Sequence, residues 1–253
     1  MSSPFLKQLV ASDRKIRDAA LASLTKFLSA NRQFEELELL KLWKGLFYCF
    51  WHSDRTLVQQ NLANDLSNLV LTVRDNNLMP FLNAFWITIC REWNSIDILR
   101  LDKFYTLLRR FIGTAFQKLR KLSWKESFVN EYISLLEALP LSVDNVKVPN
   151  GIRYHLADIY IEELSKAVPE QERKKVPIDI FLRPFETIIT KSPTKAVRLR
   201  VMKSVFEDKT LTEYGYEMAA DASDDGELPD ADSDGESEEV DEDDEEAEFA
   251  GFD

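Results

Sequence analysis

The chain has 253 residues, of which 45% are hydrophobic and 11% aromatic, and it carries a net charge of −12 at pH 7. Only seven glycines and nine prolines occur, which favours helices over short strands joined by many tight turns. Two cysteines and two histidines do not suggest a disulfide framework or a zinc site, and no segment approaches the roughly 20 apolar residues of a membrane span.

Hydrophobic residues recur at steps of three and four along most of the chain, which predicts a series of amphipathic helices. The predicted helices span residues 13–31, 35–51, 56–74, 80–93, 102–122, 124–139, 150–168, 177–191 and 194–207. Pro80 suits a first-turn position, and Asp75, Asn76 and Asn77 supply the loop before it.

Consecutive predicted helices pair as hairpins, and successive hairpins begin roughly 40 to 50 residues apart, which is typical of HEAT-type repeats. The repeat is one of architecture, since no repeated sequence is recognisable. We therefore predict an all-α fold of stacked antiparallel helix pairs, a HEAT- or armadillo-like α-solenoid, over residues 1–216.

The composition changes abruptly after Tyr216. Residues 217–253 contain 19 of the 44 Asp and Glu residues and no Lys or Arg, which leaves 25 acidic against 32 basic residues in residues 1–216. The body therefore carries a net charge of +7 and the tail −19. Because the tail has few apolar residues to offset chain entropy, we predict that it is disordered. Ser233 and Ser237, which acidic residues follow, suit phosphorylation by an acidophilic kinase.

The segment KLWKGLFYCFWHSD, residues 41–54, admits three interpretations: a packed core, a platform on which bases stack, or a thiol–imidazole site. Trp43, Leu46, Phe47 and Phe50 form a continuous stripe at helical spacing. An aromatic stripe of this kind is far more often core than a base-stacking surface. We therefore predict that these side chains are buried.

Cys49 and His52 lie three residues apart and could meet on one helical turn, which is the minimum for a thiolate–imidazole pair. No orienting acid, glycine turn or oxyanion-hole signature accompanies them. Phosphate-cradling loops and the H-E-x-x-H metal motif are also absent from the sequence. We therefore expect no catalytic residues, no metal, no cofactor and no small-molecule substrate.

Basic residues gather in two clusters, which are candidates for contact with RNA. The first comprises Lys103, Arg109, Arg110, Arg120 and Lys121, which gather on the arc opposite the apolar face of a predicted helix, together with the nearby Lys118 and Lys125. The second comprises Lys191, Lys195, Arg198, Arg200 and Lys203. Clustered cations neutralise phosphates without reading a base sequence, although solubilising a helix is the alternative role for any one of them.

The segment REWNSIDILRLDKF surrounds a short predicted turn between two helices. Its charged residues alternate in sign and comprise Arg91, Glu92, Asp97, Arg100 and Asp102. Trp93, Ile96 and Leu99 are available to pin the turn, so the first interpretation is a structural lock. Docking of a partner protein is the alternative, because alternating charges around an exposed turn can fix the register of an interface.

Three long segments resemble those of a known family: KLWKGLFYCFWHSD, REWNSIDILRLDKFYTLLRRF and PNGIRYHLADIYIEELSK. In this order and at these separations they resemble the ribosomal RNA-processing protein 1 family, and the resemblance covers residues 6 to about 206. Phe50 and His52 stand where relatives often have methionine. The resemblance implies a nucleolar assembly factor, without an active site, that joins precursors of the large ribosomal subunit.

The first hypothesis is therefore a nuclear, nucleolar scaffold that binds precursor ribosomal RNA of the large subunit together with assembly factors and ribosomal proteins. The alternative is a pure protein–protein adaptor that has no direct contact with RNA. A third, enzymatic hypothesis rests only on Cys49 and His52. We expect the acidic tail to compete with RNA or to bind basic proteins, with solubility alone as the alternative.

Overall fold

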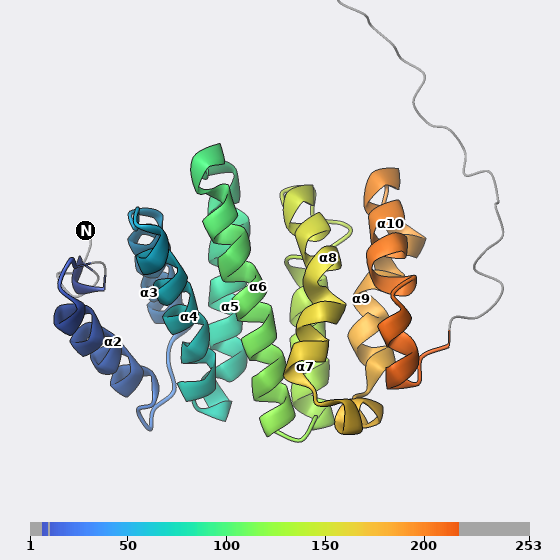
Figure 1. Cartoon of the computed structure of the whole chain (residues 1–253), viewed down its shortest axis with the longest axis horizontal. Coiled ribbons are helices and arrows are strands. Elements are labelled where there is room, and N and C mark those ends of the chain that lie inside the picture. Colours follow the sequence, from blue (N-terminus) through green and yellow to red (C-terminus); the bar gives the residue numbers. More distant parts are fainter. Residues whose placement is uncertain (1–6, 10, 218–253) are drawn as a thin grey trace, which may run out of the picture. The chain divides into compact units, whose positions relative to one another are not determined.

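The computed structural model describes residues 7–9 and 11–217, and this part of the chain contains helices and no strand (Figure 1). The predicted disorder of the acidic tail and the predicted phosphorylation of Ser233 and Ser237 concern residues that lie outside the described part. Among the described helices, none combines the length and the apolar character that crossing a bilayer requires.

Nine α-helices and four shorter helical turns make up the described part of the chain. The α-helices are α2 (Arg14–Leu28), α3 (Glu36–Trp51), α4 (Thr56–Thr72), α5 (Asp75–Glu92), α6 (Ile98–Lys121), α7 (Glu126–Ala138), α8 (Asn150–Ala167), α9 (Ile178–Lys191) and α10 (Lys195–Val201). The turns are η1 (Trp93–Ser95), η2 (Glu170–Lys175), the π-helical η3 (Met202–Phe206) and η4 (Lys209–Tyr214).

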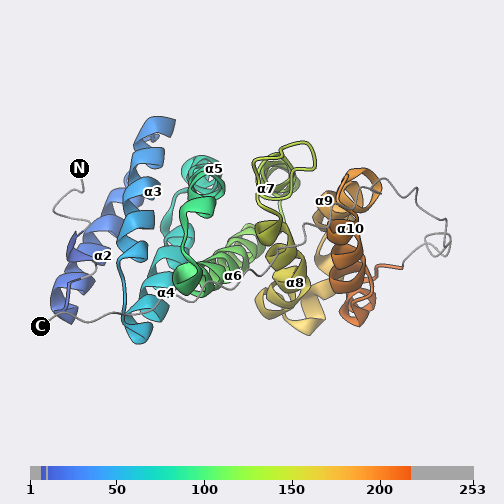
Figure 2. The same ribbon diagram turned by 90° about the horizontal axis from the view of Figure 1, so that it is seen from above.

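The helices stack in two rows, which Figure 2 shows from above. In one row α3 packs along α5, and α7 packs along α9. In the other row α2 packs on α4, α4 on α6, α6 on α8 and α8 on α10. This alternation confirms the predicted all-α solenoid of paired helices, because each helix lies beside the helix two positions along the chain. The 24-residue helix α6 occupies the centre of its row, between α4 and α8.

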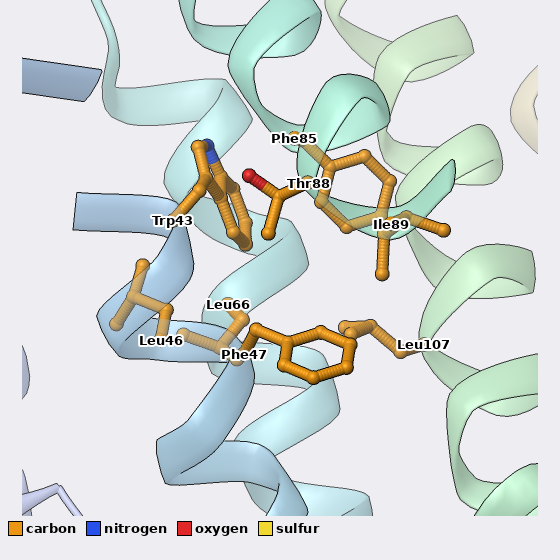
Figure 3. Close-up of a pocket in the computed structure, with 8 residues that line it drawn as sticks. All are labelled: Trp43, Leu46, Phe47, Leu66, Phe85, Thr88, Ile89 and Leu107. Carbon is orange, nitrogen blue, oxygen red and sulfur yellow. The ribbon is translucent and has the colours of Figure 1, made fainter. Parts of the chain in front are cut away.

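The aromatic stripe of α3 forms the core between the rows, so the predicted burial is confirmed. Trp43, Leu46, Phe47 and Phe50 are all buried. The indole Nε1 of Trp43 donates a hydrogen bond to the main-chain carbonyl of Phe81 at 3.1 Å, so the one polar atom of this ring is satisfied. Figure 3 shows Trp43, Leu46 and Phe47 around an apolar cavity of about 10 Å³, which is too small for an organic ligand.

Helix α5 begins at Asp75, so the prediction that residues 75–77 form a loop is wrong. The reason is the side chain of Asn77, which is buried and acts on another loop. Its Oδ1 accepts a hydrogen bond from the main-chain N–H of Phe34 at 3.0 Å, and its Nδ2 donates one to the carbonyl of Arg32 at 2.8 Å. A residue type that favours turns is therefore helical here, because its amide ties α5 to the loop before α3.

Helix α6 begins at Ile98, four residues before the predicted start at residue 102. Asp97 caps it, since its carboxylate accepts a hydrogen bond from the main-chain N–H of Arg100 at 3.2 Å. The extra turn carries Ile98 and Leu99, which are 83% and 90% exposed. Leu99 therefore does not pin the preceding turn as expected, whereas Trp93 is buried there.

Candidate nucleic-acid interface

The predicted basic arc of α6 is divided between side chains that hold the fold together and side chains that face solvent. Lys103 belongs to the first group, because only 8% of the residue is exposed. Its Nζ donates to the main-chain carbonyl of Trp51, the last residue of α3, at 2.6 Å and to that of Ser53 at 2.8 Å. The carbonyls at the C-terminal end of a helix lack partners within it, so Lys103 caps α3. Burial lowers the pKa of Lys103 to about 8.

Lys118 performs the same task for α4. The residue is 9% exposed, and its Nζ donates to the main-chain carbonyl of Val73, the C-cap residue of α4, at 3.2 Å. It also forms an ion pair with Asp75 in the first turn of α5, at 2.8 Å. A single ammonium group therefore neutralises the end of one helix and a carboxylate at the start of the next.

Arg109 joins α6 to α8. Its Nη1 lies 2.9 Å from carboxylate oxygens of both Glu162 and Glu163, and Lys166 pairs with the same two carboxylates. Hydrogen bonds from Lys166 and then Arg109 lower the pKa of Glu162. Gly113 allows this approach, because a Cβ at that position would lie 2.8 Å from Oε2 of Glu163.

Arg120 links the last turn of α6 to the end of α8. Its Nε donates to Glu172 at 2.8 Å, and its Nη1 donates to the main-chain carbonyl of Ala167 at 3.3 Å. The hydrogen bond from Arg120 lowers the pKa of Glu172. Arg120 thus combines a capping contact with an ion pair, and it remains half-buried.

The other three cations of the arc form no ion pair within the described part of the chain. Arg110 is half-buried, and its buried Nε has no hydrogen-bond partner among the described residues. Lys121 is exposed, and so is Lys125, whose Nζ lies 5.4 Å from the centre of the Phe128 ring. The proposed contact of the arc with phosphates therefore depends mainly on these exposed side chains.

The second basic cluster is divided in the same way. Arg200 binds Asp158 of α8 through two contacts of 2.6 Å, and Arg198 donates to the main-chain carbonyl of Ser192 at 2.6 Å. The exposed members form no ion pair within the described residues, and they are Lys191, Lys195 and Lys203. Helix α8 lies between α6 and α10, so the members of the cluster on α10 form a separate surface from the arc on α6.

The predicted docking segment contains a structural lock. Arg100 pairs with Asp97 at 2.7 Å and with Asp54 at 3.8 Å, and its Nε donates to the carbonyl of Trp51 at 3.3 Å. Arg91 pairs with its neighbour Glu92 at 2.9 Å. These contacts support the first interpretation of the segment. The neighbouring Asp102 is exposed, as are Ile98 and Leu99, so a surface for docking remains available.

The thiol–imidazole hypothesis has little support in the geometry. Cys49 is buried, whereas His52 is exposed at the C-cap of α3. Burial raises the pKa of the Cys49 thiol to about 12, so the thiol is protonated at neutral pH and is a poor nucleophile. Among the described residues, no group of three or more His, Cys, Asp and Glu side chains is placed to hold a metal ion.

A groove of about 740 Å³ opens where the last turns of α6 and α8 meet η2. We call it the α6–α8 groove, and its lining residues are Gln117, Arg120, Lys121, Ser123, Trp124, Lys166, Ala167, Glu172 and Lys175. Four of them are cationic and one is anionic. Arg120 forms an ion pair with Glu172, whereas Lys121 and Lys175 are exposed and form no ion pair within the described part of the chain.

Arg120 and Lys121 of this groove were predicted from the sequence, whereas Lys166, Lys175 and Trp124 were not. Lys166 and Lys175 lie beyond helix α7 in the sequence, whereas Trp124 lies in the connection between α6 and α7. The predicted architecture could have indicated them, because the helices of one row run in the same direction in a solenoid. The last turns of α6 and α8 therefore lie at the same edge.

Comparison with known proteins gives concordant matches. A family model described as nucleolar protein Nop52 matches residues 1–252. The human ribosomal RNA processing protein 1 homolog B is 36% identical over 214 residues, covering 80% of this chain and 27% of the relative. The human homolog A is 35% identical over 207 residues, covering 79% of this chain and 44% of the relative. The homolog from Dictyostelium discoideum is 30% identical over 226 residues, covering 82% of this chain and 45% of the relative. The chain thus matches less than half the length of these relatives.

Proposed function

Because the chain belongs to the Nop52 family of nucleolar proteins, we propose that it is a nucleolar factor of ribosome biogenesis that takes part in the processing of ribosomal RNA. Its specific role is that of a scaffold without catalytic activity. It binds precursor RNA of the large ribosomal subunit together with neighbouring assembly factors and ribosomal proteins. Other proteins of the particle carry out the cleavage and modification of the RNA.

The α6–α8 groove is the observation that carries the RNA-binding part of this proposal. Two lysines in it, Lys121 and Lys175, are exposed and form no ion pair within the described residues. Residues 1–216 have a net charge of +7, so the field of the body attracts phosphates towards such a groove. Contacts of this kind supply affinity that falls with salt and does not depend on base sequence.

A second candidate role, that of a pure protein adaptor, is favoured by a different observation. Lys103, Arg109, Lys118 and Arg120 direct their charges to partners within the fold, which leaves fewer cations for phosphates. The exposed pair Ile98 and Leu99 offers an apolar surface at the start of α6. A contiguous exposed apolar patch rimmed by polar residues can mark a protein interface.

Nuclease treatment of isolated particles separates the two roles. Precursor particles are captured on the tagged full-length chain and digested with nuclease. The scaffold predicts that particle proteins are partly released on digestion. It also predicts that replacing Lys121 and Lys175 with Glu weakens capture, whereas replacing the exposed lysines of α3, Lys41 and Lys44, does not. The adaptor instead predicts that particle proteins stay bound after digestion.

A double variant distinguishes the adaptor further. If Ile98→Ser and Leu99→Ser together abolish capture while the two groove lysine substitutions have no effect, the adaptor replaces the scaffold. Both substituted side chains are more than 80% exposed, so the folded state should tolerate the changes.

A further inference from the structure

The connection between α6 and α7 has an unusual backbone. Ser123 and Trp124 have φ values of 54° and 56°, and no other non-glycine residue of the described chain has a positive φ. For an L-residue this conformation is sterically unfavourable, and it is rare for a bulky side chain. Such strain persists only where the surrounding structure enforces it, and it occurs most often at functional sites.

The way in which helix α6 ends accounts for the positive φ of Ser123. The main-chain N–H of Trp124 donates to the carbonyl of Leu119 at 3.0 Å, and that of Ser123 donates to the carbonyl of Arg120 at 2.8 Å. This is the hydrogen-bond pattern of the Schellman motif, in which the residue at the position of Ser123 is left-handed and is usually glycine. The motif does not require a left-handed residue at the next position, so it leaves the conformation of Trp124 unexplained.

The side chain of Trp124 connects the core to the groove. Its ring packs edge to face against Phe181 of α9, with ring centres 5.7 Å apart and an interplanar angle of 84°. The residue is half-buried and also lines the α6–α8 groove. The strained backbone thus places an indole, held by the core, within a basic groove.

Some charged side chains of the groove form ion pairs and others do not. Glu172 is bound by Arg120, and Lys166 pairs with Glu162 and Glu163. Lys121 and Lys175 form no ion pair in the described part of the chain, although Lys175 lies near enough to Glu172 to help lower the pKa of that carboxylate. The groove therefore combines two available ammonium groups with an aromatic surface. Sites that bind single-stranded nucleic acid have this composition, because bases stack on the rings while cations contact the phosphates.

We propose that the α6–α8 groove binds single-stranded RNA, with a base stacked on Trp124 and the adjacent phosphates on Lys121 and Lys175. The proposal rests on the proposed function and specifies the form of RNA that this groove accepts. A base within a duplex is already stacked on both faces, so the indole gains a partner only from an unpaired base. The groove should therefore prefer single strands to duplexes and tolerate different base sequences.

The test is fluorescence anisotropy of labelled RNA with the full chain. The probes are an oligouridine of about ten nucleotides, the length range of known single-strand sites, and a duplex of equal length. We expect the single strand to bind more tightly. Trp124→Ala should weaken its binding about tenfold, whereas Trp124→Phe should retain most of the affinity, because a base-stacking contact contributes about 1–3 kcal/mol.

The lysines are tested by salt dependence. Replacing Lys121 and Lys175 with Ala should reduce the slope of log affinity against log salt by about 1.4, since each contact with a single-stranded phosphate contributes about 0.7. The matched control replaces Lys41 and Lys44, which are exposed on α3, and should change neither affinity nor slope. Melting temperatures of all variants establish that each protein is folded.

Three results would overturn the proposal for the groove, and they differ in whether the proposed function also fails. If folded Trp124→Ala binds the single strand as tightly as the parent, the groove is not the stacking site, although RNA binding elsewhere and the proposed function stand. If the parent chain binds neither RNA, the RNA-binding part of the proposed function fails too. If polyglutamate of equal charge competes as well as oligouridine, the groove accepts acidic protein segments.

Discussion

The ammonium group of Lys118 in α6 lies 2.8 Å from a carboxylate oxygen of Asp75 at the start of α5. It also donates a hydrogen bond to the main-chain carbonyl of Val73, the C-cap residue of α4. Three helices are therefore joined at one buried cation. Lys103 has the equivalent role at the end of α3, and Arg120 at the end of α8. Helix α6 thus acts as a central support whose cations cap its neighbours.

Lys118 and Lys121 offer a direct comparison, since they lie one turn apart on α6. We expect Lys118→Met to lower the free energy of unfolding by about 1–3 kcal/mol, because the carbonyl of Val73 and the carboxylate of Asp75 lose their partner. Lys121→Met should change it by less than about 0.5 kcal/mol, since Lys121 is exposed. Urea unfolding measures both. Equal effects would contradict the structural role assigned to Lys118.

Lys103 should make stability depend on pH. Its pKa in the folded chain is about 8, below the ordinary value of 10.5, because burial disfavours the charged form. Between these pH values the unfolded chain therefore binds more protons than the folded chain, so the free energy of unfolding rises with pH over this range. Lys103→Met removes this contribution. Between pH 8 and pH 10.5 we expect the free energy of unfolding of the parent to rise relative to that of Lys103→Met, as measured by urea unfolding at each pH. If the two free energies of unfolding change in parallel with pH, this account is contradicted.

Ser123 provides a test of the backbone strain. With φ at 54°, Ser123→Gly should raise the free energy of unfolding by about 0.5–1 kcal/mol, because glycine adopts this conformation without steric cost. Ser23→Gly is the control, since Ser23 is exposed within α2 and glycine in a helix interior lowers stability by a similar amount. If Ser123→Gly also lowers the melting temperature, the positive φ does not carry the strain that we assign to it.

The two thiols should react slowly in the folded protein. Burial raises the pKa of Cys49 and of Cys90 to about 12, against an ordinary value of 9.0, which reduces the thiolate fraction about a thousandfold. We expect iodoacetamide at pH 8 to label neither cysteine appreciably until urea unfolds the chain. Rapid labelling of Cys49 in native conditions would restore the enzymatic hypothesis.

The helices could be predicted from the sequence because hydrophobic periodicity is a local property that packing reinforces. The boundaries that failed depend on contacts between distant residues. Asn77 lies in the first turn of α5 although its residue type favours a loop, because its amide is bound by the main chain at residues 32 and 34. Asp97 caps α6, a role that was not predicted for it beside the structural lock and the alternative docking surface.

The candidate site was less predictable, because the charge of a side chain does not reveal its partner. Lys103 and Lys121 fall on the same arc of α6, yet one is buried against two carbonyls and the other is exposed. The α6–α8 groove draws on residues from position 117 to position 175 that meet only after the helices stack. Sequence therefore located the basic helix, and tertiary structure decides which of its cations are available.

The most direct test of the central claim is ultraviolet crosslinking of the tagged full-length protein in cells, followed by denaturing purification and sequencing of the attached RNA. The scaffold predicts reads concentrated on the precursor of large-subunit ribosomal RNA, with a marked loss when Lys121, Lys175 and Trp124 are all replaced by Ala. Reads no higher than those of an untagged control, while the protein still sediments with the precursor particles, would contradict direct contact with RNA and favour the adaptor.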